Sequence, residues 1–273
     1  MRYCVSLFSR ESLRLVLGLE SMQLQVFERA SNAWHVAAVQ QVGLIDLAPG
    51  ASVPAPVSLH DALADVLREH APPRAGLRTV VRNECARYFV VEPPSNARRM
   101  SDLHSAARLR FDGLYGDTLA DWALDADWCA SRPFLACAIP AQAITAVAGA
   151  ARACKLRDDG VTTEFTSSWN THRRRMPDRR AWIVHLGRQA DVVAACVSGS
   201  VTAVSMVSAA RPVAVASMVD EIARCALRWN LPVPDTVYLL GAGAADHPVR
   251  KVGAMSLVPM PPAASELLVG IGA

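Results

Sequence analysis

The chain has 273 residues, of which 52% are hydrophobic and 19% charged, and its net charge is +3 at pH 7. This composition allows a sizeable core and excludes a disordered chain, and the scattered 15 Gly and 17 Pro exclude collagen-like and low-complexity classes. The length suits one large α/β domain or two lobes. The 28 basic residues are offset by 25 acids and only 6% of residues are aromatic, so no nucleic-acid partner is predicted.

Seven cysteines lie far apart with no Cys-x-x-Cys pair, which argues against a disulfide framework and against structural zinc. Near the N-terminus, Arg10, Glu11 and Arg14 interrupt the apolar residues, so no signal-peptide core forms. We therefore expect a protein of the reducing cytoplasm that holds no metal.

The first half reads as three strands, a Ser-capped helix, an extended run, a helix, a strand and an Ala-rich helix. In chain order, these expected elements cover residues 13–20, 22–30, 34–42, 58–68, 77–92, 101–115, 134–139 and 141–154. Prolines 49, 54 and 56 indicate a loop before the first helix.

The second half begins the same order again, with three strands, a helix and two more strands. The expected elements cover residues 181–186, 191–197, 201–207, 213–229, 236–240 and 255–258, and the helix carries an apolar stripe. This repetition predicts two duplicated lobes packed around a cleft.

Residues 192–210 contain no charge and are about long enough to span a bilayer. Ser198-Gly199-Ser200 lies at their centre, and Gly supplies the positive φ that a hairpin turn requires. We favour a strand, turn and strand over a transmembrane helix.

The basic segment 171–180 is the expected boundary between the two copies. It fits either a solvated linker, which we favour, or a patch for phosphate or an acidic partner.

No Walker loop, Gly-x-Ser-x-Gly, His-Glu-x-x-His or Gly-x-Gly-x-x-Gly motif occurs, and the seven histidines are dispersed. Cys225 lies on the apolar stripe of its helix and is therefore not expected to be a nucleophile. Four acids at 117, 121, 125 and 127 surround Trp122 and Trp128 but lack the order of a calcium loop. We interpret them as an acidic, solvated turn over two buried indoles.

Three short runs ending in small residues, Leu17–Ser21, Ile183–Gly187 and Tyr238–Gly243, resemble the phosphate and adenosine loops of the actin-like ATPase fold. In that α/β fold each ribonuclease H-like lobe has the order βββαβαβ. The spacing is most similar to PilM-like type IV pilus assembly proteins and to the related GspL cytoplasmic domain. Residues 134–140 and 266–273 are similar to further segments of that family, so the resemblance covers nearly the whole chain.

The resemblance implies three parts of the chain. Residues 1–178 would form the first lobe with a small inserted subdomain at about 95–128, and residues 179–262 the second lobe. Residues 263–273 would be a closing segment that packs back on the first lobe.

The resemblance also places a nucleotide cleft at Gly18, Glu20, Ser21, His185, Gly187, Gly241 and Gly243. The family has an Asp before the Gly of the second phosphate loop, where it helps to hold magnesium, but this chain has His185. A neutral imidazole is a poor replacement for an anionic oxygen ligand of a hard cation. The first loop is also poor in Gly, since bulky Met22 follows Ser21. We therefore expect no catalytic residue, no cofactor and no hydrolysis of ATP with Mg²⁺.

Family members bind the cytoplasmic tail of an inner-membrane protein in a groove beside the inserted subdomain. By resemblance, this partner groove would involve Arg87, Tyr88, Phe89, Arg108, Arg110, Phe111 and Tyr115. The expected function is a degenerate actin-fold scaffold in type IV pilus or type II secretion machinery. It would be cytoplasmic and held at the inner membrane by its partner, with no membrane insertion of its own and with a dimer left open.

Two other interpretations remain. One is a nucleotide-binding ATPase or kinase of the same fold that uses Glu20 as its cleft carboxylate. The other is an unrelated two-lobed α/β binding protein, which would lack paired central sheets.

Overall fold

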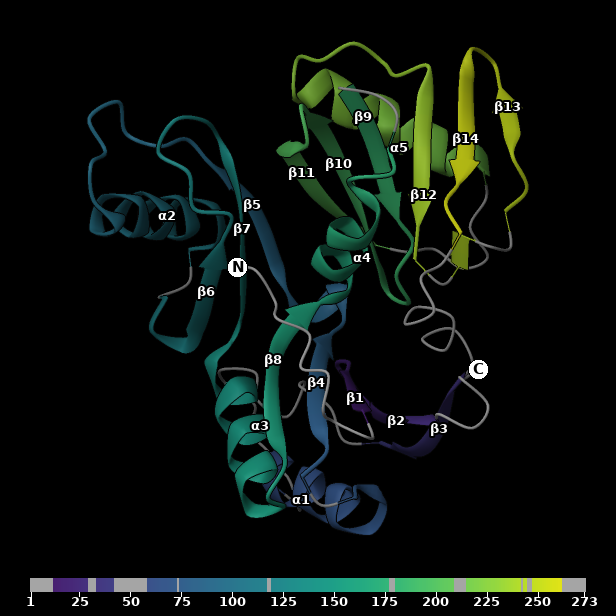
Figure 1. Ribbon diagram of the computed structural model, residues 1–273. Helices are drawn as coiled ribbons and strands as arrows, with labels where there is room; N and C mark the ends of the chain where they lie inside the picture. Colours follow the sequence, from purple (N-terminus) through teal and green to yellow (C-terminus); the bar gives the residue numbers. More distant parts are fainter. Residues whose placement is uncertain are drawn as a thin grey trace.

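The computed structural model describes residues 12–28, 33–41, 58–72, 74–116, 119–176, 180–208, 215–241, 243–244 and 247–261. Their strands form three sheets, and the two larger sheets lie one above the other in Figure 1 with a smaller sheet beside them. The predicted closing segment 263–273 and the proline-rich loop lie outside the described residues.

The first-lobe sheet has the order β3-β2-β1-β4-β8 (Figure 1). The first three strands form an antiparallel meander, β4 is parallel to β1, and β8 is parallel to β4. Helices α1 and α3 pack on each other and contribute to the core of this lobe. The bounds are β1 Ser12–Leu17, β2 Met22–Glu28, β3 Ala33–Gln40, α1 Leu59–His70, β4 Gly76–Val81, α3 Ala141–Ala153, β8 Arg157–Thr163 and α4 Glu164–His172.

The second-lobe sheet has the order β11-β10-β9-β12-β14-β13. It again has three antiparallel strands followed by parallel ones, with the short strand β13 added as a hairpin at its edge. The bounds are β9 Arg180–His185, β10 Ala190–Val197, β11 Ser200–Ser208, α5 Val215–Arg228, β12 Thr236–Leu240, β13 Arg250–Val252 and β14 Met255–Pro259. The common strand order confirms the predicted duplicated lobes.

A third sheet, of order β5-β7-β6, carries helix α2 on one face. Its elements are β5 Arg87–Val91, α2 Met100–Tyr115, the 3₁₀ helix η3 Leu119–Asp121, β6 Trp122–Ala126 and β7 Phe134–Pro140. The sheet therefore takes β5 and β7 from outside the insertion predicted at 95–128. Its edge strand β5 lies against β11 of the second lobe.

Strand β9 is buried on both faces, and alternate side chains enter different cores. Ala181 and Ile183 pack with the first lobe, whereas Trp182 and Val184 pack with α5. The stripe predicted on α5 is confirmed, since Met218, Ile222, Cys225 and Ala226 are its buried residues. Burial on both faces explains why central strands of this lobe read as continuous apolar runs.

The uncharged stretch 192–210 contains the hairpin β10–β11, as predicted. Val197 pairs with Ser200, and the turn residues Ser198 and Gly199 have φ values of 50° and 75°. Two positive φ angles identify a type I′ turn, whose twist matches that of the flanking strands. In the part of the chain that the structure describes, no helix meets the length and hydrophobicity of a membrane span.

The prediction of a single extended segment over residues 77–92 is wrong. It contains β4 and β5, which belong to different sheets and are separated by the 3₁₀ helix η2 Asn83–Cys85. The polar residues Arg82, Asn83 and Glu84 mark this break, because backbone bonds from Cys85 to Arg82 and from Ala86 to Asn83 turn the chain there. Strands β6, β8 and β13 and helix α4 were not predicted.

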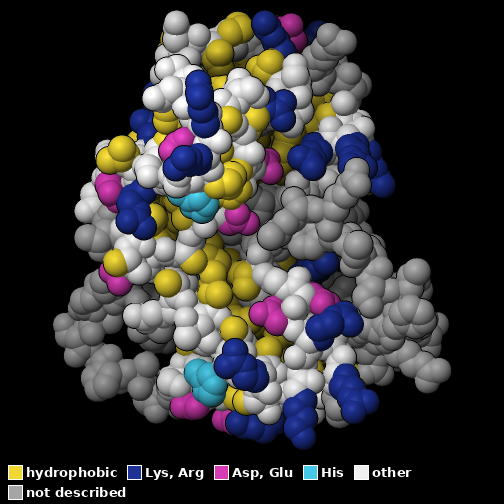
Figure 2. All heavy atoms as spheres, turned by 60° about the vertical axis from the view of Figure 1, so that its left-hand side comes forward, with side chains coloured by type: hydrophobic (Ala, Val, Ile, Leu, Met, Phe, Trp, Pro, Cys, Tyr) yellow, Lys and Arg dark blue, Asp and Glu magenta, His cyan; other side chains and the backbone are white. Residues whose placement is uncertain are grey.

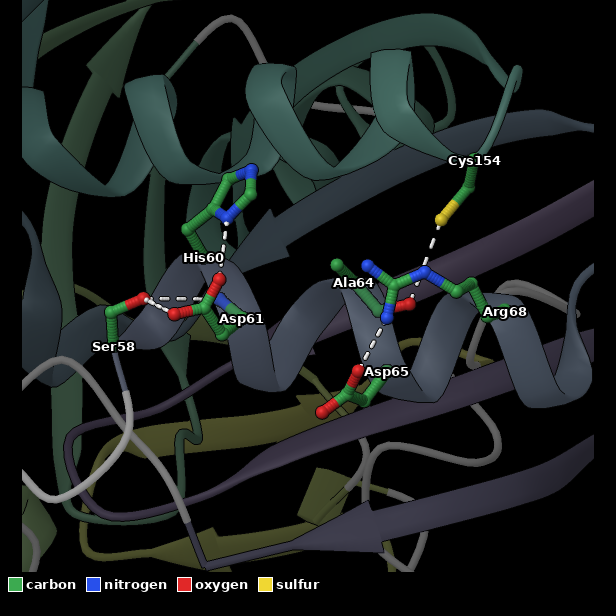
Figure 3. A network of polar contacts seen from close by, with 7 residues as sticks. All are labelled: Ser58, His60, Asp61, Ala64, Asp65, Arg68 and Cys154. Atoms are coloured by element: carbon green, nitrogen blue, oxygen red, sulfur yellow. Dashed lines mark hydrogen bonds and ion pairs between the residues drawn. The ribbon is translucent and has the colours of Figure 1, made fainter.

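Helix α1 begins at the expected cap. The Ser58 hydroxyl accepts a bond from the Asp61 amide at 3.2 Å and donates one to the Asp61 carboxylate at 2.7 Å. His60 Nδ1 lies 3.1 Å from the other Asp61 oxygen, and Arg68 pairs with Asp65 one turn later (Figure 3). The Ser58 bond is the first cause of the lowered pKa of Asp61. The two Ser58 contacts fix the start of α1.

We predict that Ser58→Ala lowers the free energy of unfolding by about 1 kcal/mol, because the Asp61 amide loses its capping acceptor. Urea denaturation measures this loss. Ser105→Ala is the matched control, since Ser105 is exposed within α2 and should change stability by less than about 0.5 kcal/mol. Equal effects of the two substitutions would contradict the capping role.

Candidate functional site

His185 links the two lobes at the place where the resemblance expects a phosphate loop. It ends β9 of the second lobe and is 3% exposed. Its Nδ1 lies 2.9 Å from the Asn83 Nδ2 of η2, and its Nε2 lies 3.0 Å from the Ser168 Oγ of α4. Both partners belong to the first lobe, so one imidazole joins the lobes through two hydrogen bonds.

Asn83 is the centre of this interlobe network and is completely buried. Its Oδ1 accepts from the Tyr88 hydroxyl at 3.0 Å and from the Phe165 amide at 3.1 Å. Its Nδ2 donates to the Ala190 carbonyl at 3.3 Å as well as toward His185. Both hydrogens and both acceptor positions of the Asn83 amide therefore have partners.

These contacts determine the protonation of His185. Since Asn83 Oδ1 must face a backbone N–H, Nδ2 must face His185, and Nδ1 of the imidazole must accept. The proton of neutral His185 then lies on Nε2, which donates to Ser168. This assignment follows from the hydrogen-bond pattern.

Two further groups support the network. The Glu164 carboxylate, 6% exposed, accepts a hydrogen bond from the backbone N–H of Asn83 at 3.2 Å. Burial is the main cause that raises the pKa of Tyr88 well above its ordinary value. The phenol therefore remains a donor to Asn83 at every physiological pH.

The predicted cleft glycines have close neighbours. A Cβ on Gly187 would lie 2.1 Å from the Ala190 carbonyl oxygen and 2.9 Å from Asn83 Nδ2. A Cβ on Gly241, which has a φ of +92°, would lie 2.6 Å from the Leu186 carbonyl oxygen. Tight packing of the β9 and β12 ends accounts for both glycines without a phosphate.

The remaining predicted cleft residues lie at the β1–β2 turn and after β12. Gly18 donates its amide to the Ser21 carbonyl at 2.9 Å, and its Cα faces Arg82. Glu20 is exposed at the tip of this turn, and Gly243 makes only ordinary contacts with Leu186. The structure thus brings His185, Gly187 and Gly241 together around Asn83, while Glu20 lies at the surface.

The residues predicted for the partner groove divide into three sets by burial. Tyr88, Phe89 and Phe111 are buried, so these side chains form core. Arg108 and Arg110 are exposed on α2. Arg87 and Tyr115 are half-buried, and the Arg87 guanidinium lies between the Tyr115 and Trp122 rings, at 5.6 and 5.3 Å from their centroids.

The described part of the chain gives little support to a cysteine nucleophile or to a metal site. Burial raises the pKa of the Cys225 thiol to about 11, which disfavours the thiolate that a nucleophile requires. No group of three His, Cys, Asp or Glu side chains among the described residues is arranged to hold a metal ion.

Asn83, Ser168 and Glu164 were not identified from the sequence. The available signal for Asn83 was a polar tripeptide, Arg82 to Glu84, inside an otherwise apolar run. Nothing in the sequence indicated that Ser168 lies beside His185.

No family model and no curated protein matches this sequence. Solved structures do match. The PilM-PilN type IV pilus biogenesis complex aligns with a TM-score of 0.58 at 15% identity, over 91% of this chain and 88% of the other. The cytoplasmic domain of EpsL, an inner-membrane component of the Vibrio cholerae type II secretion system, aligns at 0.57 and 12% identity, over 94% and 92%.

A third similar structure is a Bacteroides thetaiotaomicron protein of unknown function with an actin-like ATPase fold. It aligns with a TM-score of 0.55 at 9% identity, over 85% of this chain and 82% of that one. The chain therefore has the actin-like ATPase fold, and its expected likeness to PilM and the GspL cytoplasmic domain is confirmed for the fold.

We predict that Asn83→Ala lowers the free energy of unfolding by about 3 kcal/mol. It leaves the Tyr88 hydroxyl, the Phe165 amide and His185 Nδ1 buried without their partner. In a double-mutant cycle, the loss of unfolding free energy caused by His185→Ala should be about 1 kcal/mol smaller in the Asn83→Ala background than in the wild-type protein. Asn170→Ala, at an exposed position of α4, is the control. Strict additivity would show that the two side chains are not coupled.

Two glycines should respond in opposite directions to alanine. Gly187→Ala should destabilise the fold by about 2 kcal/mol, because its methyl group meets the Ala190 carbonyl. Gly113→Ala should stabilise it by about 0.5 to 1 kcal/mol, since Gly113 lies in α2 with nothing within 4 Å. Thermal unfolding of both variants checks the sign. A Gly187→Ala protein as stable as the wild type would contradict the tight packing of Gly187 against the Ala190 carbonyl.

Proposed function

We propose that the chain is a degenerate actin-fold scaffold of a type IV pilus or type II secretion machine. In this proposal it docks the cytoplasmic tail of an inner-membrane partner and does not hydrolyse ATP. The protein would be cytoplasmic and held at the inner membrane through that partner, without cofactor.

The observation that carries the proposal is the use of His185. The resemblance places an acidic magnesium ligand at this position, whereas the ring nitrogens of His185 bond to Asn83 and Ser168 of the opposite lobe. An imidazole with both nitrogens occupied offers no ligand to a cation and no partner to a phosphate. Binding a nucleotide there would first require these buried bonds to break.

Two similar solved structures support the choice of a pilus or secretion machine. PilM is found in a complex with PilN for type IV pilus biogenesis, and EpsL is an inner-membrane component of a secretion system. The described residues of this chain include no helix that could span a membrane. A nucleotide-dependent enzyme of the same fold is the competing proposal.

A thermal-shift titration with millimolar ATP and Mg²⁺ tests the proposal. A ligand that binds only the folded state at 100 times its Kd stabilises it by about 2.7 kcal/mol, which raises the Tm by several degrees. We expect no change in Tm with ATP, ADP or Mg²⁺ alone.

A magnesium-dependent rise would contradict the scaffold proposal. ATP turnover that Glu20→Ala abolishes would establish the enzyme instead. Glu20 is exposed in the β1–β2 turn, so this variant should fold normally and isolates the chemical role of the carboxylate.

A further inference from the structure

Among the residues that the structure describes, strand β6 is an unpaired edge of the third sheet. The sheet order is β5-β7-β6, and the opposite edge, β5, lies against β11 of the second lobe. Among the described residues no strand pairs with the outer side of β6. An unpaired edge is the place where an extended peptide can add to a sheet.

The register shows which groups of β6 point outward. The Asp127 amide donates to the Leu135 carbonyl of β7 at 2.9 Å, and antiparallel pairing alternates the direction of successive residues. The N–H and C=O of Asp125 and Ala123 therefore point toward β7, and those of Ala126, Leu124 and Trp122 point away from it. The Asp125 carboxylate agrees with this, because it covers the outward Ala126 amide at 2.8 Å.

Leu124, at the centre of β6, consequently offers both backbone groups to a partner, and Trp122 at the start of the strand points the same way. Its side chain lies on the α2 face and is half-buried there with Trp122. Removing the Leu124 N–H would cost the sheet no hydrogen bond, since that N–H points away from β7.

Three acidic residues lie along this edge, and the Arg87 guanidinium lies 5.3 Å from the centroid of the Trp122 ring. Asp121 immediately precedes β6, Asp125 lies within it and Asp127 immediately follows it, and all three are exposed. Asp121 and Asp127 form no ion pair with a described basic residue. Figure 2, in which this side of the molecule is turned forward, shows hydrophobic side chains across the middle of the face with charged side chains around them.

We propose that the β6 edge binds an extended peptide segment in which a short apolar stretch is flanked by Lys or Arg. The inference rests on the proposed function and names the chemistry of the tail that the scaffold docks. Leu124 pairs with the peptide backbone, Trp122 and Leu124 contact its apolar side chains, and Asp121 and Asp127 pair with its basic residues.

Two arguments favour this occupant. Cytoplasmic segments next to membrane spans carry an excess of Lys and Arg, so a tail of this kind complements exposed carboxylates. Asp121 ends η3 and Asp127 follows β6, so the two acids flank the five strand residues, which span about 17 Å. The basic residues of an extended partner should therefore lie about six positions apart.

A displayed library of random octapeptides, selected on the full chain, tests the proposal. The wild-type protein should enrich peptides with Lys or Arg near both ends and apolar residues between them. Selected peptides should bind Leu124→Pro at least tenfold more weakly, because proline removes the outward N–H. Leu124→Ala, which loses the same side chain but keeps that N–H, is the matched control and should bind the selected peptides at least tenfold more tightly than Leu124→Pro.

A second pair of variants tests the charges and does not depend on how the proline is tolerated. Asp121→Asn with Asp127→Asn should weaken binding of the selected peptides at least fivefold and abolish the enrichment of Lys and Arg. Asp220→Asn, at an exposed position of α5 in the other lobe, should change neither.

Peptides without basic residues, or binding that is equal for Leu124→Pro and Leu124→Ala, would overturn the inference. Either result leaves the scaffold proposal standing, because the tail would then dock elsewhere. A selection that enriches no peptide on the wild-type protein would count against this site, and a Tm raised by ATP with Mg²⁺ would count against the scaffold while leaving the β6 result intact.

Discussion

The polar network between the two lobes is centred on one buried contact, the bond between His185 and Asn83. Asn83 follows β4 of the first lobe and His185 ends β9 of the second, so the contact joins the carboxyl ends of two central strands. Buried polar groups cost free energy unless every donor and acceptor finds a partner. Asn83, in η2, meets that condition with groups from β9, β10, β5 and α4, and thereby connects four other elements.

This contact also connects the fold to the proposed function. An actin-like ATPase needs its cleft for phosphate and magnesium, and anionic side chains there hold the cation. In this chain the equivalent place is filled by an imidazole, an amide and a hydroxyl that satisfy one another. The lobes are also joined where β5 lies against β11. Lobes that are joined in this way suit the proposed docking role, and the β6 edge is the surface that we propose for it.

The sequence predicted those parts of the fold that have local signals. Strands β9, β10 and β12 read as apolar runs because both faces are buried, and α1 carries a serine cap and one apolar stripe. Strand β8 was missed because this edge strand begins Arg157-Asp158-Asp159-Gly160, and backbone pairing to β4 places it. Of the predicted cleft residues, His185, Gly187 and Gly241 do meet, but Asn83 finds three of its partners 82 to 107 residues away, which no local pattern encodes.

The protonation state of His185 tests this account most directly. Two-dimensional ¹H–¹⁵N NMR of protein labelled with ¹⁵N-histidine distinguishes a protonated Nε2 from a protonated Nδ1. We expect a neutral ring at pH 7 with its proton on Nε2 and with Nδ1 accepting from Asn83, and we expect no change when ATP and Mg²⁺ are added. A proton on Nδ1, a charged ring, or a signal that moves with ATP and Mg²⁺ would contradict the interlobe network and the function built on it.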